Sequence, residues 1–168
     1  GSVKDGSGNG VRHSWVEVRD SDGDYIRDKG APTKAQGQFS MRLDSSAQYD
    51  LIAQAPWNSS QVRSAACSVE IDGSGNVDVS NSDSACVNSD GLVTLDLRDG
   101  NFTVNTKDSN NDSVAFADLN MSIGNWYSHA RSDANGVAQF FVDMDEVRAM
   151  NRNVSTPWNI EIRLYAPW

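Results

Sequence analysis

The chain repeats itself, and this repetition limits more than any other feature what it can fold into. The segment that ends at Ala55-Pro56-Trp57 has a counterpart that ends at Ala166-Pro167-Trp168. Upstream of these endings, residues 14–19 correspond to residues 117–123. A repeat of this length is typical of duplicated small domains, each with its own core. The sequence therefore predicts two folding units of roughly 80 residues each rather than one larger domain.

Short alternating patterns run through both copies. Phe39, Met41 and Leu43 alternate with polar residues, as expected for half-buried strands. Only 38% of the residues are apolar, and Ser, Asn, Asp and Gly are abundant, which favours short strands joined by tight turns. We expect an all-β fold of two tandem small antiparallel β-sandwiches, Ig-like or prealbumin-like. Residues 143–150 break the alternation and predict a short helix.

The boundary between the two repeats is expected in the range from Gly91 to Arg98, and we assign residues 1–91 to the first sandwich and 92–168 to the second. The first copy runs on into a strand that contains Cys67, whereas the second copy stops at Trp168. We therefore expect the second sandwich to lack its last strand. Further residues, the segment 92–98 or a neighbouring molecule on an exposed edge are the alternatives for filling that position.

The opening strand and turn at residues 3–11, the central turns at Gly37-Gln38-Phe39 and 133–137, and the two Ala-Pro endings carry a family resemblance. The chain resembles the prealbumin-like sandwiches of bacterial surface proteins, among them the carboxypeptidase regulatory-like domain and the collagen-adhesin B-type repeat. The resemblance implies sandwiches strung along exported proteins as stalks, spacers or accessory modules.

The two cysteines, Cys67 and Cys86, are expected to form a disulfide in an exported protein, the alternative being two buried thiols in a cytosolic one. Five Asn-x-Ser/Thr sequons and the turn-rich composition favour an extracellular or cell-surface location. A net charge of -9 argues against nucleic acid as a partner. Apolar runs of about 18 residues are lacking, so no membrane insertion is expected.

One turn suggests a metal. Asp20, Asp22 and Asp24 present carboxylates at alternate positions around Gly23, in the manner of a calcium loop. The alternative is that these residues serve the turn itself, because their side chains bond the local backbone. Position 12 of such a loop is Ala31 instead of the bidentate Glu. Apart from calcium, no cofactor is expected.

Three tryptophans are candidates for ligand contact, because an exposed indole can stack on a sugar or anchor a protein partner. They are Trp57, Trp158 and Trp168, and packing against the sandwich is the alternative for each. Catalytic patterns are weak: His13 and His129 are the only histidines, and no Gly-x-Ser-x-Gly elbow occurs. We expect no enzyme.

These observations lead to one main hypothesis and two alternatives. The main one is a non-catalytic structural or stalk module of a larger exported surface or adhesin-type protein, whose partners are neighbouring domains of the same polypeptide. The first alternative is a module that binds carbohydrate or an extracellular protein through loop tryptophans, with or without weak calcium sites. The second is an accessory domain of a secreted hydrolase.

Overall fold

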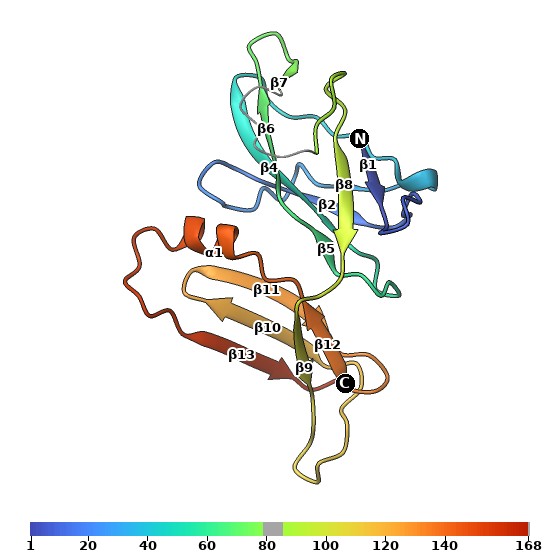
Figure 1. Cartoon of the computed structure of the whole chain (residues 1–168), viewed down its shortest axis with the longest axis vertical. Coiled ribbons are helices and arrows are strands. Elements are labelled where there is room, and N and C mark those ends of the chain that lie inside the picture. The colour runs from blue at the N-terminus through green and yellow to red at the C-terminus, as the bar shows by residue number, and fades with distance from the viewer. Residues whose placement is uncertain (79–85, 168) are drawn as a thin grey trace. The chain divides into compact units, whose positions relative to one another are not determined.

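The computed structural model describes residues 1–78 and 86–167 (Figure 1). It is mostly β, with 40% strand and 6% helix, in agreement with the expected all-β class. The chain divides into two compact units, Gly1–Asp99 and Gly100–Trp168. Each unit has its own cluster of buried apolar side chains.

The first unit contains one sheet in which every strand pair is antiparallel except β1 with β8. Its strands are β1 (Ser2–Lys4), β2 (Trp15–Arg19), β3 (Ala31–Pro32), β4 (Ala47–Gln54), β5 (Arg63–Ser64), β6 (Cys67–Ile71), β7 (Val77–Asp78) and β8 (Thr94–Arg98). A 3-10 turn, η1 (Ala35–Gly37), precedes β4. The order is β1-β8-β5-β4-β2-β3, and β6 pairs with β4 and β7. The central strand β4 is therefore covered along both edges.

Alternation along the strands builds the core of the first unit. Val16 and Val18 of β2 are fully buried, while Glu17 between them is only half-buried. On β8, Leu95 and Leu97 are 1% and 2% exposed and join the same cluster. Residues 94–98, which we expected to open the second repeat, thus belong to the first unit, because their leucines fill its core. The first compact unit ends at Asp99 and the second begins at Gly100, directly after the range from Gly91 to Arg98 in which we expected the boundary.

The second unit holds two small sheets and the single α-helix of the described residues. Its elements are β9 (Phe102–Asn105), β10 (Asp118–Ile123), β11 (Trp126–Arg131), β12 (Val137–Phe140), α1 (Met144–Met150) and β13 (Ile160–Tyr165). One sheet has the order β11-β10-β13 and the other pairs β12 with β9. Both sheets are antiparallel.

Helix α1 is the short helix expected from residues 143–150. Asp143 caps it, because its carboxylate accepts hydrogen bonds from the backbone N–H groups of Asp145 and Glu146. The helix buries Val147 and lies against β11, where the indole N–H of the fully buried Trp126 donates to the Glu146 carboxylate at 3.2 Å. Asp143 therefore caps the helix, and Glu146 in the acidic first turn bonds the core tryptophan.

A buried hydroxyl joins three segments of the first unit. The Thr33 Oγ1 accepts from the Ser14 N–H at 2.9 Å and donates to the Val11 carbonyl at 2.7 Å. The backbone N–H of Thr33 also donates to the Ser14 carbonyl at 2.8 Å. Thr33 is only 4% exposed. The side chain thus fixes the entry to β2 against the segment that follows β3.

The second unit uses the same arrangement at other positions. The Ser132 Oγ accepts from the Ala117 N–H at 2.9 Å and donates to the Val114 carbonyl at 2.9 Å. The Ser132 N–H donates to the Ala117 carbonyl at 2.9 Å, and Ser132 is 2% exposed. The second residue before each entry strand has a positive φ in both units, 66° at His13 and 58° at Phe116. The same pattern of hydrogen bonds around a buried hydroxyl therefore occurs within each unit, in addition to the similarity in sequence.

Candidate functional site

Trp57 is the most exposed large apolar side chain described, at 94% of its full surface. It lies in the loop between β4 and β5, where the Ser59 N–H donates to the Pro56 carbonyl at 2.9 Å. The Gln61 side chain fastens this loop, since it accepts from the Gly6 N–H at 3.2 Å and donates to the Leu97 carbonyl at 2.8 Å. At this exposure the Trp57 ring makes little contact with the core of the first unit. An indole on a fastened loop is available to a ligand.

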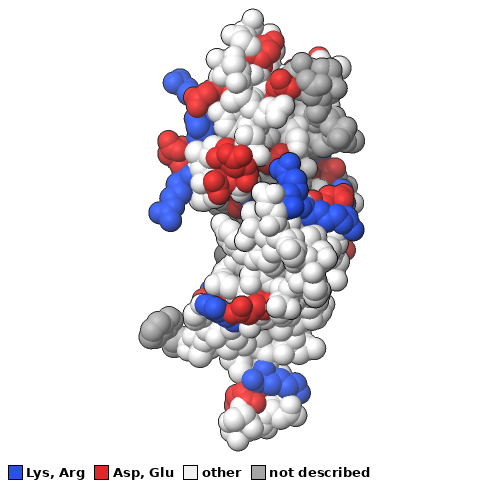
Figure 2. Space-filling model, turned by 90° about the vertical axis from the view of Figure 1, so that its left-hand side faces the viewer, with Lys and Arg blue, Asp and Glu red and all other residues white. Residues whose placement is uncertain are grey.

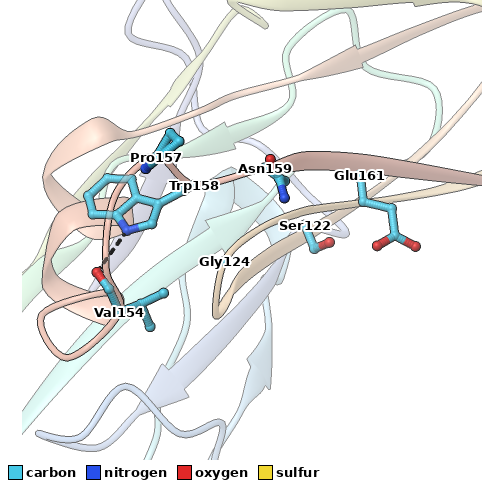
Figure 3. A pocket seen from close by; sticks show the side chains of 7 residues that line it. All are labelled: Ser122, Gly124, Val154, Pro157, Trp158, Asn159 and Glu161. Carbon is cyan, nitrogen blue, oxygen red and sulfur yellow. Dashed lines mark hydrogen bonds between the residues drawn. The ribbon is translucent and has the colours of Figure 1, made fainter.

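Trp158 has a different environment in the second unit. It is half-buried against the core, and its indole N–H donates to the Val154 carbonyl at 3.1 Å (Figure 3). Its ring forms one side of a hollow of about 270 Å³, with the Glu161 carboxylate at the other side. The lining residues are Ser122, Gly124, Val154, Pro157, Trp158, Asn159 and Glu161. The volume of this hollow lies just below the usual range for small-molecule pockets. The third candidate tryptophan, Trp168, lies outside the described residues.

The Asp20 turn is held by its own backbone. The Asp20 Oδ1 accepts hydrogen bonds from the N–H groups of Asp22 and Asp24, at 3.0 and 2.9 Å. The Gly23 N–H donates to the Asp20 carbonyl at 3.0 Å, and Gly23 has a φ of 86°. Across residues 1–78 and 86–167, no three His, Cys, Asp or Glu side chains gather as a metal site. The Asp20 side chain therefore stabilises its own turn, and calcium binding at this turn stays a prediction.

The same five-residue turn occurs at least six times among the described residues. The turns begin at Asp5, Asp20, Asp72, Asn88, Asp108 and Asp133. In each, the Oδ1 of the first residue accepts from the third and fifth N–H groups, and the fourth residue has a positive φ. That fourth residue is Gly except at Asn111, because these two types tolerate left-handed backbone best.

Two of these carboxylates have perturbed acidity. The backbone N–H of Asn9 lowers the pKa of Asp5, and the backbone N–H of Asn76 lowers the pKa of Asp72. A hydrogen bond to the charged form favours ionisation, so the turn is strongest when its carboxylate is ionised.

Cys67 and Cys86 form the expected disulfide, with an S–S distance of 2.02 Å and a Cα–Cα distance of 5.9 Å. The bond ties β6 to the segment in which Val87 forms a β-bridge with Val93. No described helix has the length and apolar character needed to span a bilayer. The disulfide is compatible with an extracellular location.

Histidine chemistry finds little support in the geometry. His129 lies 3.7 Å from the Asp118 carboxylate, but both side chains are more than half exposed. Figure 2 shows Asp and Glu side chains lying beside Lys and Arg side chains on the face that it draws. Such mixed pairs are typical of a solvated surface and do not indicate a reaction centre.

Strand β13 is the site that the sequence only partly indicated. All six of its residues are exposed, and four are large and hydrophobic: Ile160, Ile162, Leu164 and Tyr165, at 54%, 37%, 45% and 51% exposed. One edge of β13 pairs with β10, and no described strand pairs with the other edge. This edge combines free backbone hydrogen-bonding groups with apolar side chains, as a protein contact surface does.

Comparison with protein-family models, curated proteins and solved structures gives no match to this chain. The resemblance to prealbumin-like repeats therefore stays a prediction, and function must be argued from the geometry of the chain itself.

Proposed function

We propose that the chain is a non-catalytic structural module, a tandem duplication that serves as a stalk or spacer in a larger exported surface protein. The observation that carries this proposal is the hydrogen-bond arrangement shared by Thr33 and Ser132, each of which ties an entry strand to the same kind of turn. Duplicated modules suit a spacer, because adding copies lengthens the chain without any new fold.

Two further features support an exported, mechanical role. The disulfide between Cys67 and Cys86 favours an oxidising compartment. The recurring Asp turns shorten the connections and satisfy their backbone groups internally, which reduces the conformational freedom of the loops. Stability and low flexibility are the properties that a spacer needs, and a prealbumin-like pair of sandwiches would provide them.

Small-angle X-ray scattering tests the spacer directly. A compact single domain of this length has a radius of gyration of about 15 Å. Two modules in series should give a clearly larger value and a distance distribution with two maxima. A compact scattering profile would contradict the spacer.

The binding alternative rests on Trp57, whose 94% exposure is unusual for an indole. A carbohydrate or protein ligand should quench or shift its fluorescence, and Trp57→Ala should abolish that change. Tyr127→Ala is the matched control, because Tyr127 is another exposed aromatic residue at 63%. If the chain is only a spacer, its tryptophan fluorescence should not change when glycans or calcium are added. A saturable change lost in Trp57→Ala would favour the binding module.

A calcium effect would be assigned to the Asp20 turn by Asp22→Asn combined with Asp24→Asn. These substitutions leave the Asp20 Oδ1 hydrogen bonds in place, because those involve backbone N–H groups. An accessory domain of a secreted hydrolase would behave in the same way as a spacer in these experiments on the isolated chain. The sequence of the full-length gene distinguishes the two, because only the accessory role requires a hydrolase domain in the same polypeptide.

A further inference from the structure

The core of the second unit is open along β13. Ile162 lies opposite Met121 of β10, and Leu164 lies opposite Leu119. Residues directly opposite on an antiparallel pair project to the same face, so Ile162 and Leu164 point to the core side. Met121 and Leu119 are fully buried, whereas Ile162 and Leu164 are 37% and 45% exposed. Burial therefore stops at this strand.

The first unit shows how such a strand is covered. Its β4 pairs with β2 on one edge, as β13 pairs with β10, and with β6 on the other. Leu51 of β4 lies opposite Cys67 and Tyr49 lies opposite Val69. As a result, Leu51 is 2% exposed and Tyr49 is 6% exposed. An added antiparallel strand with alternate apolar residues is what buries the core side of β4.

The segment 92–98 does not supply that strand to the second unit. Its strand β8 is parallel to β1 and antiparallel to β5, and its leucines are buried in the first core. Among the described residues, no other segment of this chain pairs with the second edge of β13, which leaves that edge available to a strand from another molecule.

We propose that a second copy of this chain supplies it, with β13 pairing antiparallel to β13 of the second copy about a two-fold axis at Ile162. The strand reads Ile-Glu-Ile-Arg-Leu-Tyr, and this sequence is complementary to itself. In the proposed register, Ile160 faces Leu164 of the second copy and Ile162 faces Ile162. Both copies turn their apolar residues to the same side of one continuous sheet.

Charge selects this register over its neighbours. Glu161 and Arg163 lie on the other face of β13, where they form an ion pair of 2.7 Å within the strand. In the proposed register each Glu161 also faces Arg163 of the second copy. A slip of two residues would place Glu161 opposite Glu161 or Arg163 opposite Arg163, and directly opposed like charges destabilise a sheet. A slip of one residue would put the two apolar rows on opposite faces.

The contact involves one short strand from each copy, so it is smaller than a standard protein interface. We expect a weak dimer whose population rises from micromolar to millimolar protein, as measured by sedimentation velocity on the intact chain. Hydrogen exchange should slow in β13 over the same range of concentration. A chain that stays monomeric at millimolar concentration would overturn the proposal and would leave the edge for a strand from a different polypeptide.

Charge reversal provides the sharper test. Glu161→Arg and Arg163→Glu should each weaken self-association at least tenfold, because every cross-strand pair becomes repulsive. An equimolar mixture of the two variants should associate again, since each arginine then faces a glutamate. Both side chains are more than half exposed, so folding should be unaffected. Arg148→Glu on α1, 63% exposed, is the matched control and should leave association unchanged.

A crosslink fixes the register independently of charge. Ile162→Cys places two thiols opposite each other at the two-fold axis, where opposed Cα atoms are about 4.5–5.5 Å apart. Tyr165→Cys would place its two thiols roughly 20 Å apart in the same register. Covalent dimer is expected for Ile162→Cys alone. Equal crosslinking of both variants, or association of Glu161→Arg at the wild-type level, would overturn the proposal.

Discussion

Replacing Thr33 by Val tests whether the buried hydroxyl holds the first unit together. Valine has nearly the same shape as threonine but lacks the hydroxyl that the Ser14 N–H and the Val11 carbonyl both use. The substitution therefore removes two hydrogen bonds and leaves the packing volume almost unchanged. Because Ser14 is only 1% exposed, water cannot easily replace the lost acceptor.

The expected loss of stability comes from the two backbone groups that lose their hydrogen-bond partner. A buried backbone N–H without a partner costs about 1–3 kcal/mol, and the partly buried Val11 carbonyl adds roughly 1 kcal/mol. We expect Thr33→Val to lower the free energy of unfolding by about 3 kcal/mol. With a urea slope near 1.5 kcal/mol/M, that corresponds to a midpoint shift of about 2 M.

Urea unfolding combined with hydrogen exchange measured by mass spectrometry is the suitable assay, because two units need not unfold together. Thr33→Val should increase exchange in the first unit, and Ser132→Ala should do so in the second. Thr33→Ser keeps the hydroxyl and controls for the methyl group. If Thr33→Val and Thr33→Ser unfold within about 0.5 kcal/mol of each other, the hydroxyl does not have the proposed importance.

Three further effects are expected. Reduction of the Cys67–Cys86 disulfide should cost about 3 kcal/mol by the chain-entropy relation, visible as a lower melting temperature in reductant, and Cys67→Ala with Cys86→Ala should lose that sensitivity. The pKa of Asp72 is lowered in the folded state, so its ionised carboxylate stabilises the fold fully above the ordinary aspartate pKa, and this stabilisation is lost as the pH falls through the folded pKa. Between pH 6 and 2 the melting temperature should therefore drop less for Asp72→Asn than for wild type. Gly37→Ala should destabilise more than Gly8→Ala: both have a positive φ, but a Cβ at Gly37 would lie 2.2 Å from the Val3 carbonyl oxygen, whereas at Gly8 it meets nothing within 4 Å.

Local chemistry made much of this fold predictable. Alternation placed Val16 and Val18 on a buried face, and the Asp-Gly spacing placed the turns, because both depend on residues that are close in sequence. The cysteine pair and the helix at 143–150 were predictable for the same reason.

Pairing between distant strands was not predictable in this way. The alternating run with Leu95 and Leu97 has the same pattern whichever core it fills, so the sequence alone placed the boundary only within a range from Gly91 to Arg98 and did not show that these leucines fill the first core. The Ala-Pro-Trp ending likewise does not reveal that Trp57 is exposed, since exposure depends on how the loop is fastened by Gln61. Contacts between residues distant in sequence decide both which core the leucines fill and how exposed Trp57 is.

The edge of β13 links stability to association. Strand β4 is paired on both edges in a unit that also carries a disulfide, whereas β10 is the one described strand that pairs with β13. Strands with few buried contacts open most easily, so β13 should exchange its amide hydrogens faster than β4 in dilute protein. A second copy that binds the native form stabilises it by mass action. Exchange in β13 and β10 should therefore slow as protein concentration rises while exchange in β4 and β2 stays constant, and equal slowing in all four strands would contradict a contact located at this edge.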